Sequence, residues 1–233
     1  MNTLDPKPLP ELAVNFALTW DARATTRNHT RADFSSPGDK YRLQEIRAGG
    51  DAVMAGRGTV IAEKMRLRVP DAQLQAERAT RGMPPEPLRV IVSASGKIDP
   101  TWPILADPEG APVIVFSTEQ MPAEVRLALE GKATVYLLGK DRLNLRAMLE
   151  TLREKHGAKR VICEGGPALL RSLLEAKLVD ELNVTFCPLI FGGLGAPTLT
   201  DERGIYLPET LAWQLDSLEI VEGEAFACYR VKK

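Results

Sequence analysis

A carboxylate followed by two glycines and a proline is the strongest chemical signal in the sequence. It occurs at residues 164–167 (Glu-Gly-Gly-Pro), directly after the apolar run Val-Ile-Cys at residues 161–163. We expect the apolar run to be a buried strand and Pro167 to occupy the first position of a helix. The free N–H groups and the dipole of that helix start would bind a phosphate or a pyrophosphate. A tight strand-to-helix turn without a ligand explains the same spacing, so both interpretations stay open.

A second glycine-rich turn is expected at residues 56–60 (Gly-Arg-Gly-Thr-Val), after the apolar run of residues 51–55. The Thr59 hydroxyl and the free N–H groups of this turn could hold a phosphate, although a purely structural turn has the same composition. Neither turn contains the G-x-G-x-x-G pattern, so the sequence does not support an ordinary Rossmann dinucleotide site.

Two acidic residues stand at the ends of predicted strands. Glu164 follows the strand of residues 161–163, and Asp21 follows the strand of residues 12–18. Either carboxylate could act in proton transfer or accept hydrogen bonds from sugar hydroxyls. A charge interaction with a helix start is the alternative for Glu164, and Asp21 is equally ambiguous. We expect His156, at the end of a predicted helix, to be a helix C-terminal cation.

Several reaction classes are excluded by what the sequence lacks. The two histidines, His29 and His156, lie outside any H-x-E motif and no P-C-x-x-C follows, which excludes a zinc deaminase of that type. No G-x-S-x-G elbow of a serine hydrolase is present. The cysteines are far apart and odd in number, which suits a reducing cytosol, and we expect them to be buried apolar groups rather than nucleophiles. They are Cys163, Cys187 and Cys228.

The overall composition is typical of a globular domain. The chain has 233 residues, of which 44% are hydrophobic and 26% charged. We expect a single domain over residues 1–233, with a flexible tail over about residues 1–10, in the cytoplasm. No run of about 20 apolar residues and no signal-peptide core are present, so no membrane association is expected. The net charge of −1 argues against a nucleic-acid partner, yet residues 21–68 carry a net charge of +4, which suits a small anionic ligand.

The hydrophobic periodicity alternates between strands and helices, which predicts an α/β domain with a mostly parallel sheet and antiparallel edge strands. The segment over residues 69–87 is expected to be a surface loop with a helical turn around residues 72–78. Expected strands span residues 12–18, 51–55, 89–93, 113–116, 134–138, 161–163, 181–186, 215–220 and 225–231; expected helices span 37–47, a short one within 56–63, 122–131, 144–156 and 167–176.

In their order and spacing, these motifs resemble the RibD C-terminal family, the reductase domain of the riboflavin-biosynthesis deaminase–reductases. The resemblance covers about residues 12–230. Residues 17–23 are similar to the family's ASLDGK/R, 46–53 to LRAxxDAV and 56–60 to GxxTV. Further matches are residues 164–167, 178–182 and 188–193. The resemblance implies a dihydrofolate-reductase-like three-layer fold, with a mostly parallel central sheet flanked by helices and antiparallel C-terminal edge strands.

The resemblance also implies an activity: reduction by NADPH of the ribosyl group of 5-amino-6-(5-phosphoribosylamino)uracil, with hydride transfer to C1′, in a homodimer. Asp21 and Glu164 would be catalytic. The implied cofactor-binding residues are Ala17, Gly56, Thr59, Glu63, Ser93, Lys97, Gly165, Gly166, Pro167, Ala168 and Leu169, with Lys97 suited to the 2′-phosphate. The implied substrate-binding residues are Arg31, Arg47, Leu67, Arg68 and Glu164, with Arg47 on the phosphate and Glu164 on the sugar.

The substrate half of the family's pattern departs more than the cofactor half. Glu63 and Met65 stand where the family has Asp and Pro, and Arg31 stands where a serine often contacts the substrate phosphate. Two other functions therefore stay open. One is an NADPH-dependent reductase of a pterin or dihydrofolate-like substrate, and the other is a non-catalytic NADP(H)-binding module.

Overall fold

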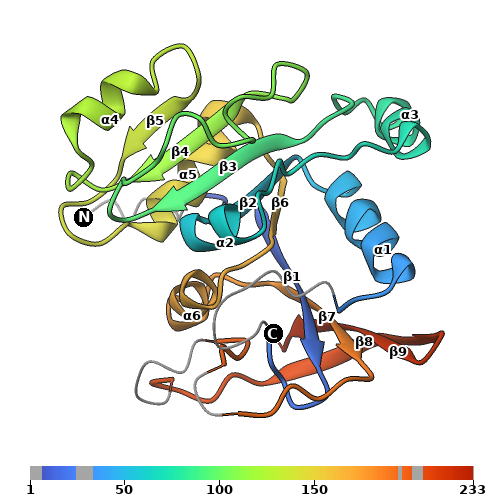
Figure 1. Cartoon of the computed structure of the whole chain (residues 1–233). Helices are drawn as coiled ribbons and strands as arrows, with labels where there is room; N and C mark the ends of the chain where they lie inside the picture. The colour runs from blue at the N-terminus through green and yellow to red at the C-terminus, as the bar shows by residue number, and fades with distance from the viewer. Residues whose placement is uncertain (1–6, 25–33, 194–195, 201–206, 233) are drawn as a thin grey trace.

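The computed structural model describes residues 7–24, 34–193, 196–200 and 207–232. These residues form one sheet of nine strands in the order β5-β4-β3-β2-β6-β1-β7-β9-β8 (Figure 1). The strands are β1 (Glu11–Thr19), β2 (Ala52–Gly56), β3 (Leu88–Ser93), β4 (Val113–Ser117), β5 (Thr134–Leu137), β6 (Arg160–Cys163), β7 (Glu181–Cys187), β8 (Trp213–Val221) and β9 (Glu224–Val231).

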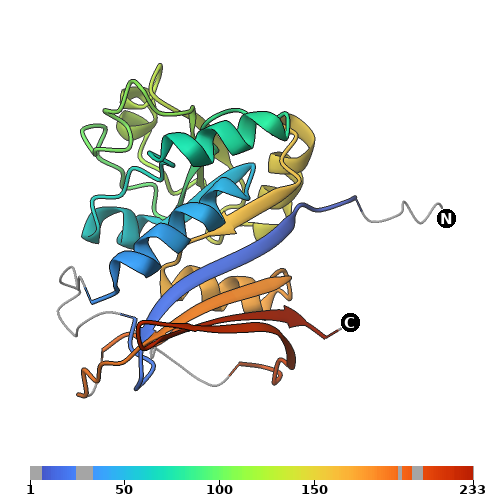
Figure 2. The same ribbon diagram turned by 90° about the vertical axis from the view of Figure 1, so that its right-hand side faces the viewer.

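The direction of the strands confirms the predicted fold class. Every neighbouring pair from β5 to β7 is parallel, whereas β9 is antiparallel to β7 and β8 is antiparallel to β9. The β8–β9 hairpin (red) forms the lower edge of the sheet in Figure 2. The carboxyl ends of the seven parallel strands, β5 to β7 in this order, therefore lie along one edge, where open α/β sheets bind ligands.

Helices cover both faces of the sheet and give it three layers. Alternate residues of a strand point to opposite faces, so Leu12 and Val14 of β1 belong to one core and Ala13 to the other. The first core packs under α5 and α6, and the second packs under α2 and α4 with part of α1. The helices are α1 (Pro37–Ala48), α2 (Arg57–Ala62), α3 (Ala72–Thr80), α4 (Ala123–Ala128), α5 (Leu145–His156) and α6 (Pro167–Glu175).

The ends of α1 and α5 follow the capping residues that the sequence indicates. The Ser36 hydroxyl accepts a hydrogen bond from the N–H of Asp39, and Pro37 begins α1. The Asn144 side chain accepts one from the N–H of Ala147, and Gly157 ends α5 in the left-handed conformation at φ +68°. These helix boundaries were therefore predictable from local chemistry.

The segment expected to be a surface loop with a helical turn around residues 72–78 contains a full helix there. Asp71 caps α3, which runs for nine residues and buries Arg78 completely. The Arg78 guanidinium donates to the carbonyl oxygens of Ala48 at 2.9 Å and Gly50 at 2.6 Å, at the end of α1. Its Nε donates to the Pro84 carbonyl at 2.8 Å. Apolar periodicity indicated no more than a turn because a buried anchor of this helix is an arginine that pairs with backbone carbonyls.

His156 lies in the last turn of α5, where we expected a cation, but its surroundings disfavour the charged form. Burial lowers the pKa of His156, and the neighbouring charge of Lys155 lowers it further. Its Nε2 lies 3.1 Å from the Tyr136 hydroxyl, and the two rings pack edge to face. A hydrogen-bonded neutral ring fits this half-buried position better than a cation does.

The three cysteines are buried, as predicted. Burial raises the pKa of the Cys163 and Cys187 thiols to about 12, so neither is a thiolate at pH 7. Within the described residues, no group of three or more His, Cys, Asp or Glu side chains is placed to hold a metal ion. None of the described helices has the length and apolar composition that crossing a membrane requires.

Candidate functional site

The two glycine-rich turns meet at the carboxyl ends of β2 and β6. The N–H of Gly56 donates to the carbonyl oxygen of Gly165 at 2.7 Å. The peptide bond between Gly165 and Gly166 is cis, and Gly165 has φ +96°. A Cβ atom on Gly166 would lie 2.6 Å from the Thr59 Oγ1, so any larger residue there would have to displace the Thr59 hydroxyl. Turns separated by more than 100 residues in the sequence thus form one backbone-lined cradle.

The start of α6 completes this cradle. Gly166 is the N-cap and offers no side chain to the first turn, and Pro167 lacks an N–H. The first-turn N–H groups of Ala168 and Leu169 have no intrahelical acceptor and no side-chain acceptor among the described residues, and they carry the positive end of the helix dipole. Such a set of donors, next to glycines that leave room, fits the pyrophosphate of a nicotinamide dinucleotide.

Glu164 and Arg47 bind each other beside this cradle. Arg47 Nε lies 2.5 Å from Glu164 Oε1, and the second terminal nitrogen of Arg47 lies 2.7 Å from Glu164 Oε2. The remaining terminal nitrogen donates to the Arg68 carbonyl oxygen at 2.8 Å. The Glu164 and Arg47 side chains are 3% and 13% exposed. Burial opposes the charge of Arg47, but the Glu164 charge and hydrogen bonds outweigh it and raise the pKa of Arg47.

This pairing joins α1 to the end of β6 and limits what Arg47 can offer a ligand. A guanidinium has five N–H groups, of which three are engaged here. One N–H on each terminal nitrogen is left. The structure therefore brings two of the predicted substrate residues, Arg47 and Glu164, together, and they bind each other.

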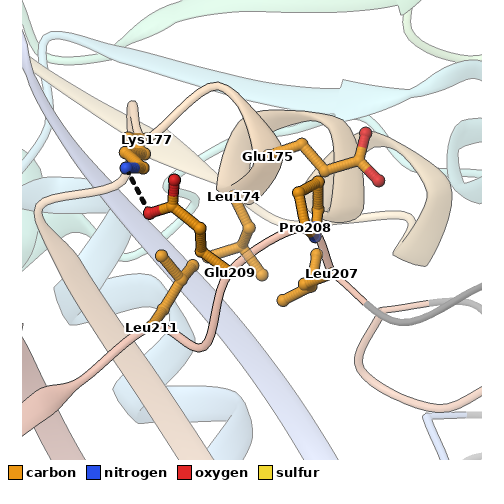
Figure 3. Close-up of a pocket in the computed structure, with 7 residues that line it drawn as sticks. All are labelled: Leu174, Glu175, Lys177, Leu207, Pro208, Glu209 and Leu211. Carbon is orange, nitrogen blue, oxygen red and sulfur yellow. Dashed lines mark hydrogen bonds and ion pairs between the residues drawn. The ribbon is translucent and has the colours of Figure 1, made fainter.

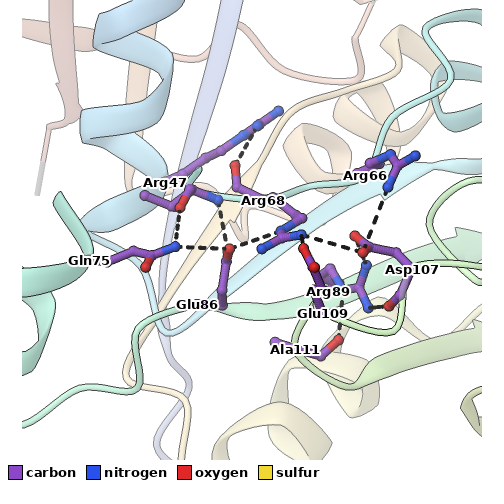
Figure 4. A network of polar contacts seen from close by, with 10 residues as sticks. Arg47, Arg66, Arg68, Gln75, Glu86, Arg89, Asp107, Glu109 and Ala111 are labelled. Carbon is purple, nitrogen blue, oxygen red and sulfur yellow. Dashed lines mark hydrogen bonds and ion pairs between the residues drawn. The ribbon is translucent and has the colours of Figure 1, made fainter. Parts of the chain in front are cut away.

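The side chains of the predicted substrate residues Leu67 and Arg68 are both engaged in contacts within the protein. Leu67 has φ +54° and its side chain, 1% exposed, packs in the core under α2, so it offers a ligand only its backbone. The Arg68 guanidinium bonds Glu86 at 3.0 Å and also contacts two further carboxylates, as Figure 4 shows. Those two carboxylates are Asp107 and Glu109, both at 3.4 Å. The segment that holds Arg47 is thus anchored by ion pairs of its own.

Asp21 links the turn after β1 to the segment after β7. Its carboxylate accepts hydrogen bonds from the Thr19 hydroxyl at 2.6 Å and from the N–H groups of Phe191 at 3.1 Å and Gly192 at 2.8 Å. The Thr19 hydrogen bond and these two backbone N–H groups lower the pKa of Asp21 to about 2. A carboxylate with this pKa carries no proton at pH 7, so the geometry does not suit Asp21 as a proton donor.

The other predicted cofactor residues lie along the same edge of the sheet. Ala17 is half-buried in β1, and Glu63 ends α2. The Ser93 hydroxyl is buried and accepts a hydrogen bond from the N–H of Gly96, so it shapes the turn that presents the exposed Lys97. Arg31 lies outside the described residues.

Sequence reasoning missed Arg57 as a member of this edge. Its Nε donates to the Lys97 carbonyl oxygen at 2.7 Å, which links the start of α2 to the turn after β3. The signal was the position of Arg57 between two glycines at the end of a strand, but its partner is 40 residues away and no local pattern indicates the pairing.

Two pockets lie away from this edge. The first, of about 40 Å³, is at the far end of α6 and is too small for a nucleotide (Figure 3). Leu174 and Leu211 line it, and Lys177 pairs with Glu209 at 2.6 Å beside it. The second is a polar groove where β1 begins, lined in part by Glu11 and Arg230. Neither lies at the carboxyl ends of the strands, so neither is taken as the candidate site.

Comparisons with known proteins identify the family of the chain. Residues 10–224 match the sequence family described as the RibD C-terminal domain. The 2,5-diamino-6-ribosylamino-4(3H)-pyrimidinone 5′-phosphate reductase of Archaeoglobus fulgidus is 34% identical, over 82% of this chain and 86% of that protein. The reductase of the same name from Methanothermobacter thermautotrophicus is also 34% identical, over 84% and 86%.

Solved structures show the same fold. A pyrimidine reductase-like protein from Corynebacterium diphtheriae matches with a TM-score of 0.81 at 20% identity, over 96% of this chain and 92% of that one. RibD from Acinetobacter baumannii matches with a TM-score of 0.77 at 21% identity. This chain spans 59% of the length of that RibD chain. The sequence match and the shared fold together show that the chain belongs to the RibD C-terminal domain family.

Proposed function

We propose that this protein is an NADPH-dependent reductase that converts the ribosyl group of a phosphorylated ribosylaminopyrimidine to a ribityl chain. The observation that carries the proposal is the cradle formed by Gly56, Gly165, Gly166 and the start of α6, with the buried Glu164 at its side. Named relatives in the family are pyrimidine reductases, which are oxidoreductases.

The proposed substrate is 2,5-diamino-6-ribosylamino-4(3H)-pyrimidinone 5′-phosphate. The relatives at 34% identity bear this name, and each is covered over 86% of its length. The uracil analogue implied by the sequence resemblance has an oxygen in place of the 2-amino group. The two compounds share the ribosyl phosphate on which the reaction occurs, so a direct comparison between them decides the preferred base.

The residues of the chain bind and orient, while NADPH supplies the hydride. N–H groups of the α6 first turn and the Thr59 hydroxyl would hold the pyrophosphate. Glu164, fixed by Arg47, would accept hydrogen bonds from ribosyl hydroxyls and set C1′ of the opened imine toward the hydride. The two N–H groups left on Arg47 suit one oxygen each of the substrate phosphate. When the hydride adds to C1′, the imine nitrogen bonded to C1′ must take up a proton. Since Asp21 carries no proton at pH 7, water would supply it.

We also propose that the protein is a homodimer in a reducing compartment such as the cytoplasm. The edge strand β8 supports this, because Leu215, Leu218 and Ile220 expose 48%, 56% and 72% of their surface on it. An exposed, apolar edge strand favours pairing with another chain. Light scattering in solution should give twice the chain mass of 25.6 kDa.

The function is tested by following NADPH oxidation at 340 nm with three substrates: the diaminopyrimidinone ribosyl phosphate, its uracil analogue and dihydrofolate. Turnover is expected with the first, at least tenfold above the other two. Turnover of dihydrofolate alone would support a reductase of pterin-like substrates. If NADPH binds and none of the three is reduced, the chain is a binding module and the proposal fails.

A further inference from the structure

One carboxylate near the site has no part in the proposed reaction: Glu86, whose side chain is 10% exposed. Pro85 and Pro87 stand on either side of it in the sequence. A proline ring fixes its own φ and limits the residue before it to extended backbone, so the segment that carries Glu86 is stiff. The Arg78 Nε ties this segment to α3 through the Pro84 carbonyl oxygen, at 2.8 Å. The backbone just before β3 therefore holds the Glu86 carboxylate in a defined place.

The two oxygens of this carboxylate bind donors of two neighbouring residues. Oε2 accepts a hydrogen bond from the Val69 N–H at 2.8 Å, and Oε1 accepts one from the Arg68 Nε at 3.0 Å (Figure 4). The Gln75 side chain donates to the Val69 carbonyl oxygen at 2.9 Å. This segment follows Leu67, which has φ +54°. Since a leucine rarely adopts that conformation, contacts from outside the segment must keep it in place.

The Val69 N–H and the Arg68 carbonyl belong to the same peptide group. Its N–H donates to Glu86, and its oxygen accepts a hydrogen bond from Arg47 at 2.8 Å. Hydrogen bonds in a chain polarise one another, so donation to a carboxylate makes the oxygen of this peptide a stronger acceptor. Burial opposes the charge of Arg47, but the charges of Glu164 and Glu86 both raise its pKa. Glu86 thus acts on Arg47 through one peptide group as well as through its charge.

We propose that Glu86 is a positioning residue that aims Arg47 at the substrate phosphate and thereby sets the preference for a phosphorylated ribosyl group. The inference rests on the proposed function, in which the two N–H groups left on Arg47 bind that phosphate. Glu164 holds the guanidinium through Nε and one terminal nitrogen, and the peptide bound by Glu86 holds the other terminal nitrogen. With all three nitrogens fixed, the two remaining N–H groups keep one direction, as paired hydrogen bonds to phosphate oxygens require. Glu86 itself needs no contact with the substrate.

The test compares the ribosyl phosphate with the same compound lacking its 5′-phosphate, each with saturating NADPH. The ratio of the two kcat/KM values measures what the phosphate contributes, and a general loss of folded protein lowers both values equally. E86Q keeps the size of the side chain but removes its charge and replaces one accepting oxygen by an NH₂ group. We expect the ratio to fall about tenfold, mainly through a higher KM for the phosphorylated substrate. The dissociation constant of NADPH should stay within about twofold.

E109Q is the matched control. Glu109 lies 3.4 Å from the same Arg68 guanidinium, but its side chain is 82% exposed and it does not bind the Val69 N–H, which donates to Glu86. E109Q should leave the ratio within about twofold, because exposed ion pairs contribute little. An equal fall in E86Q and E109Q would show that the charge around Arg68 matters rather than the peptide, and would overturn the inference.

R47K supplies a second comparison. Lysine keeps the positive charge but lacks the planar fork that spans Glu164 and the Arg68 carbonyl. Adding E86Q to R47K should lower the ratio no further, because the route from Glu86 to the phosphate is already broken. A further fall as large as that of E86Q alone would overturn the inference.

The remaining outcomes separate this inference from the proposed function. A ratio near one in the unaltered protein, or an equal loss of both kcat/KM values in E86Q, would overturn the positioning role. If E86Q fails to fold, E86D decides, since its shorter side chain keeps the charge but cannot reach both donors. An unchanged ratio in E86D would then overturn the inference. Failure of the unaltered protein to reduce the ribosyl phosphate at all would instead overturn the proposed function.

Discussion

Two regions border the candidate site, and they present different chemical groups to it. One is the cradle between β2 and β6, and the other is the end of α1. The cradle presents backbone N–H groups and glycines, and neither helix that starts there, α2 or α6, has a hydrogen bond from a capping side chain. The end of α1 presents Arg47, whose charge is already satisfied by Glu164 and by the Arg68 carbonyl. The proposed cofactor side is therefore open to an anion, whereas the proposed substrate side must share or exchange groups that the fold already uses.

The same contrast is visible in the sequence. The turn residues on the cofactor side match the family pattern, because a Cβ atom would collide there. On the substrate side, Leu67 and Arg68 stand near the family's positions but serve the core and an ion-pair network (Figure 4). Backbone geometry constrains residue type more strictly than a network of charges, which can be rebuilt with other partners.

The largest expected effect comes from breaking the Arg47–Glu164 pair. R47M leaves the Glu164 carboxylate, 3% exposed, without its partner. We expect the free energy of unfolding to fall by about 3 kcal/mol or more, as for other buried pairs that lose one member. Urea denaturation measures this loss, and reductase activity should fall with it because Glu164 is no longer held in place.

R42M on the same helix is the control for that substitution. Arg42 pairs with Glu219 at 3.4 Å, and the two side chains are 31% and 60% exposed. Exposed pairs contribute little, so R42M should cost less than about 1 kcal/mol. A loss in R47M no greater than in R42M would contradict the view that the substrate side is held by a buried charge pair.

The next effect in size concerns the cradle. G166A places a Cβ atom 2.6 Å from the Thr59 Oγ1 and narrows the space for a pyrophosphate. We expect NADPH to bind about 100-fold more weakly, equivalent to about 2.7 kcal/mol, by fluorescence titration. G58A, two positions after Gly56 of the cradle, has no atom within 4 Å of its new Cβ and should bind NADPH normally. Equal affinities in G166A and G58A would show that the cradle does not receive the cofactor.

The smallest effect is the pH dependence of the Asp21 anchor. The folded state lowers the pKa of Asp21 from 3.8 to about 2. The anchor therefore stabilises the protein fully above pH 3.8, and this contribution is lost as the pH falls through about 2. D21N removes it, so its stability relative to the unaltered protein should be lowest at neutral pH and recover in acid. A denaturant midpoint difference that does not change between pH 7 and pH 2.5 would contradict this role.

Local chemistry in the sequence was enough to predict most strands, the caps of α1 and α5 and the two glycine-rich turns. It could not predict that Arg47 and Glu164 pair across 117 residues, because neither residue carries a local sign of its partner. The same holds for Arg78, whose acceptors are carbonyls at the end of another helix. Asp21 shows a further limit: a carboxylate after a strand is either a reagent or an anchor, and only its three donors distinguish the two.

The position of β1 has a consequence for how the chain is made. Ala13 of β1 pairs with Ile162 of β6 on one side and with Glu181 of β7 on the other. At roughly 5–20 residues per second, about 10–30 s pass between synthesis of the first strand and of its two neighbours. Contacts so distant in sequence also slow folding in general. During synthesis, β1 must therefore wait without its native partners on either edge until β6 and β7 have emerged.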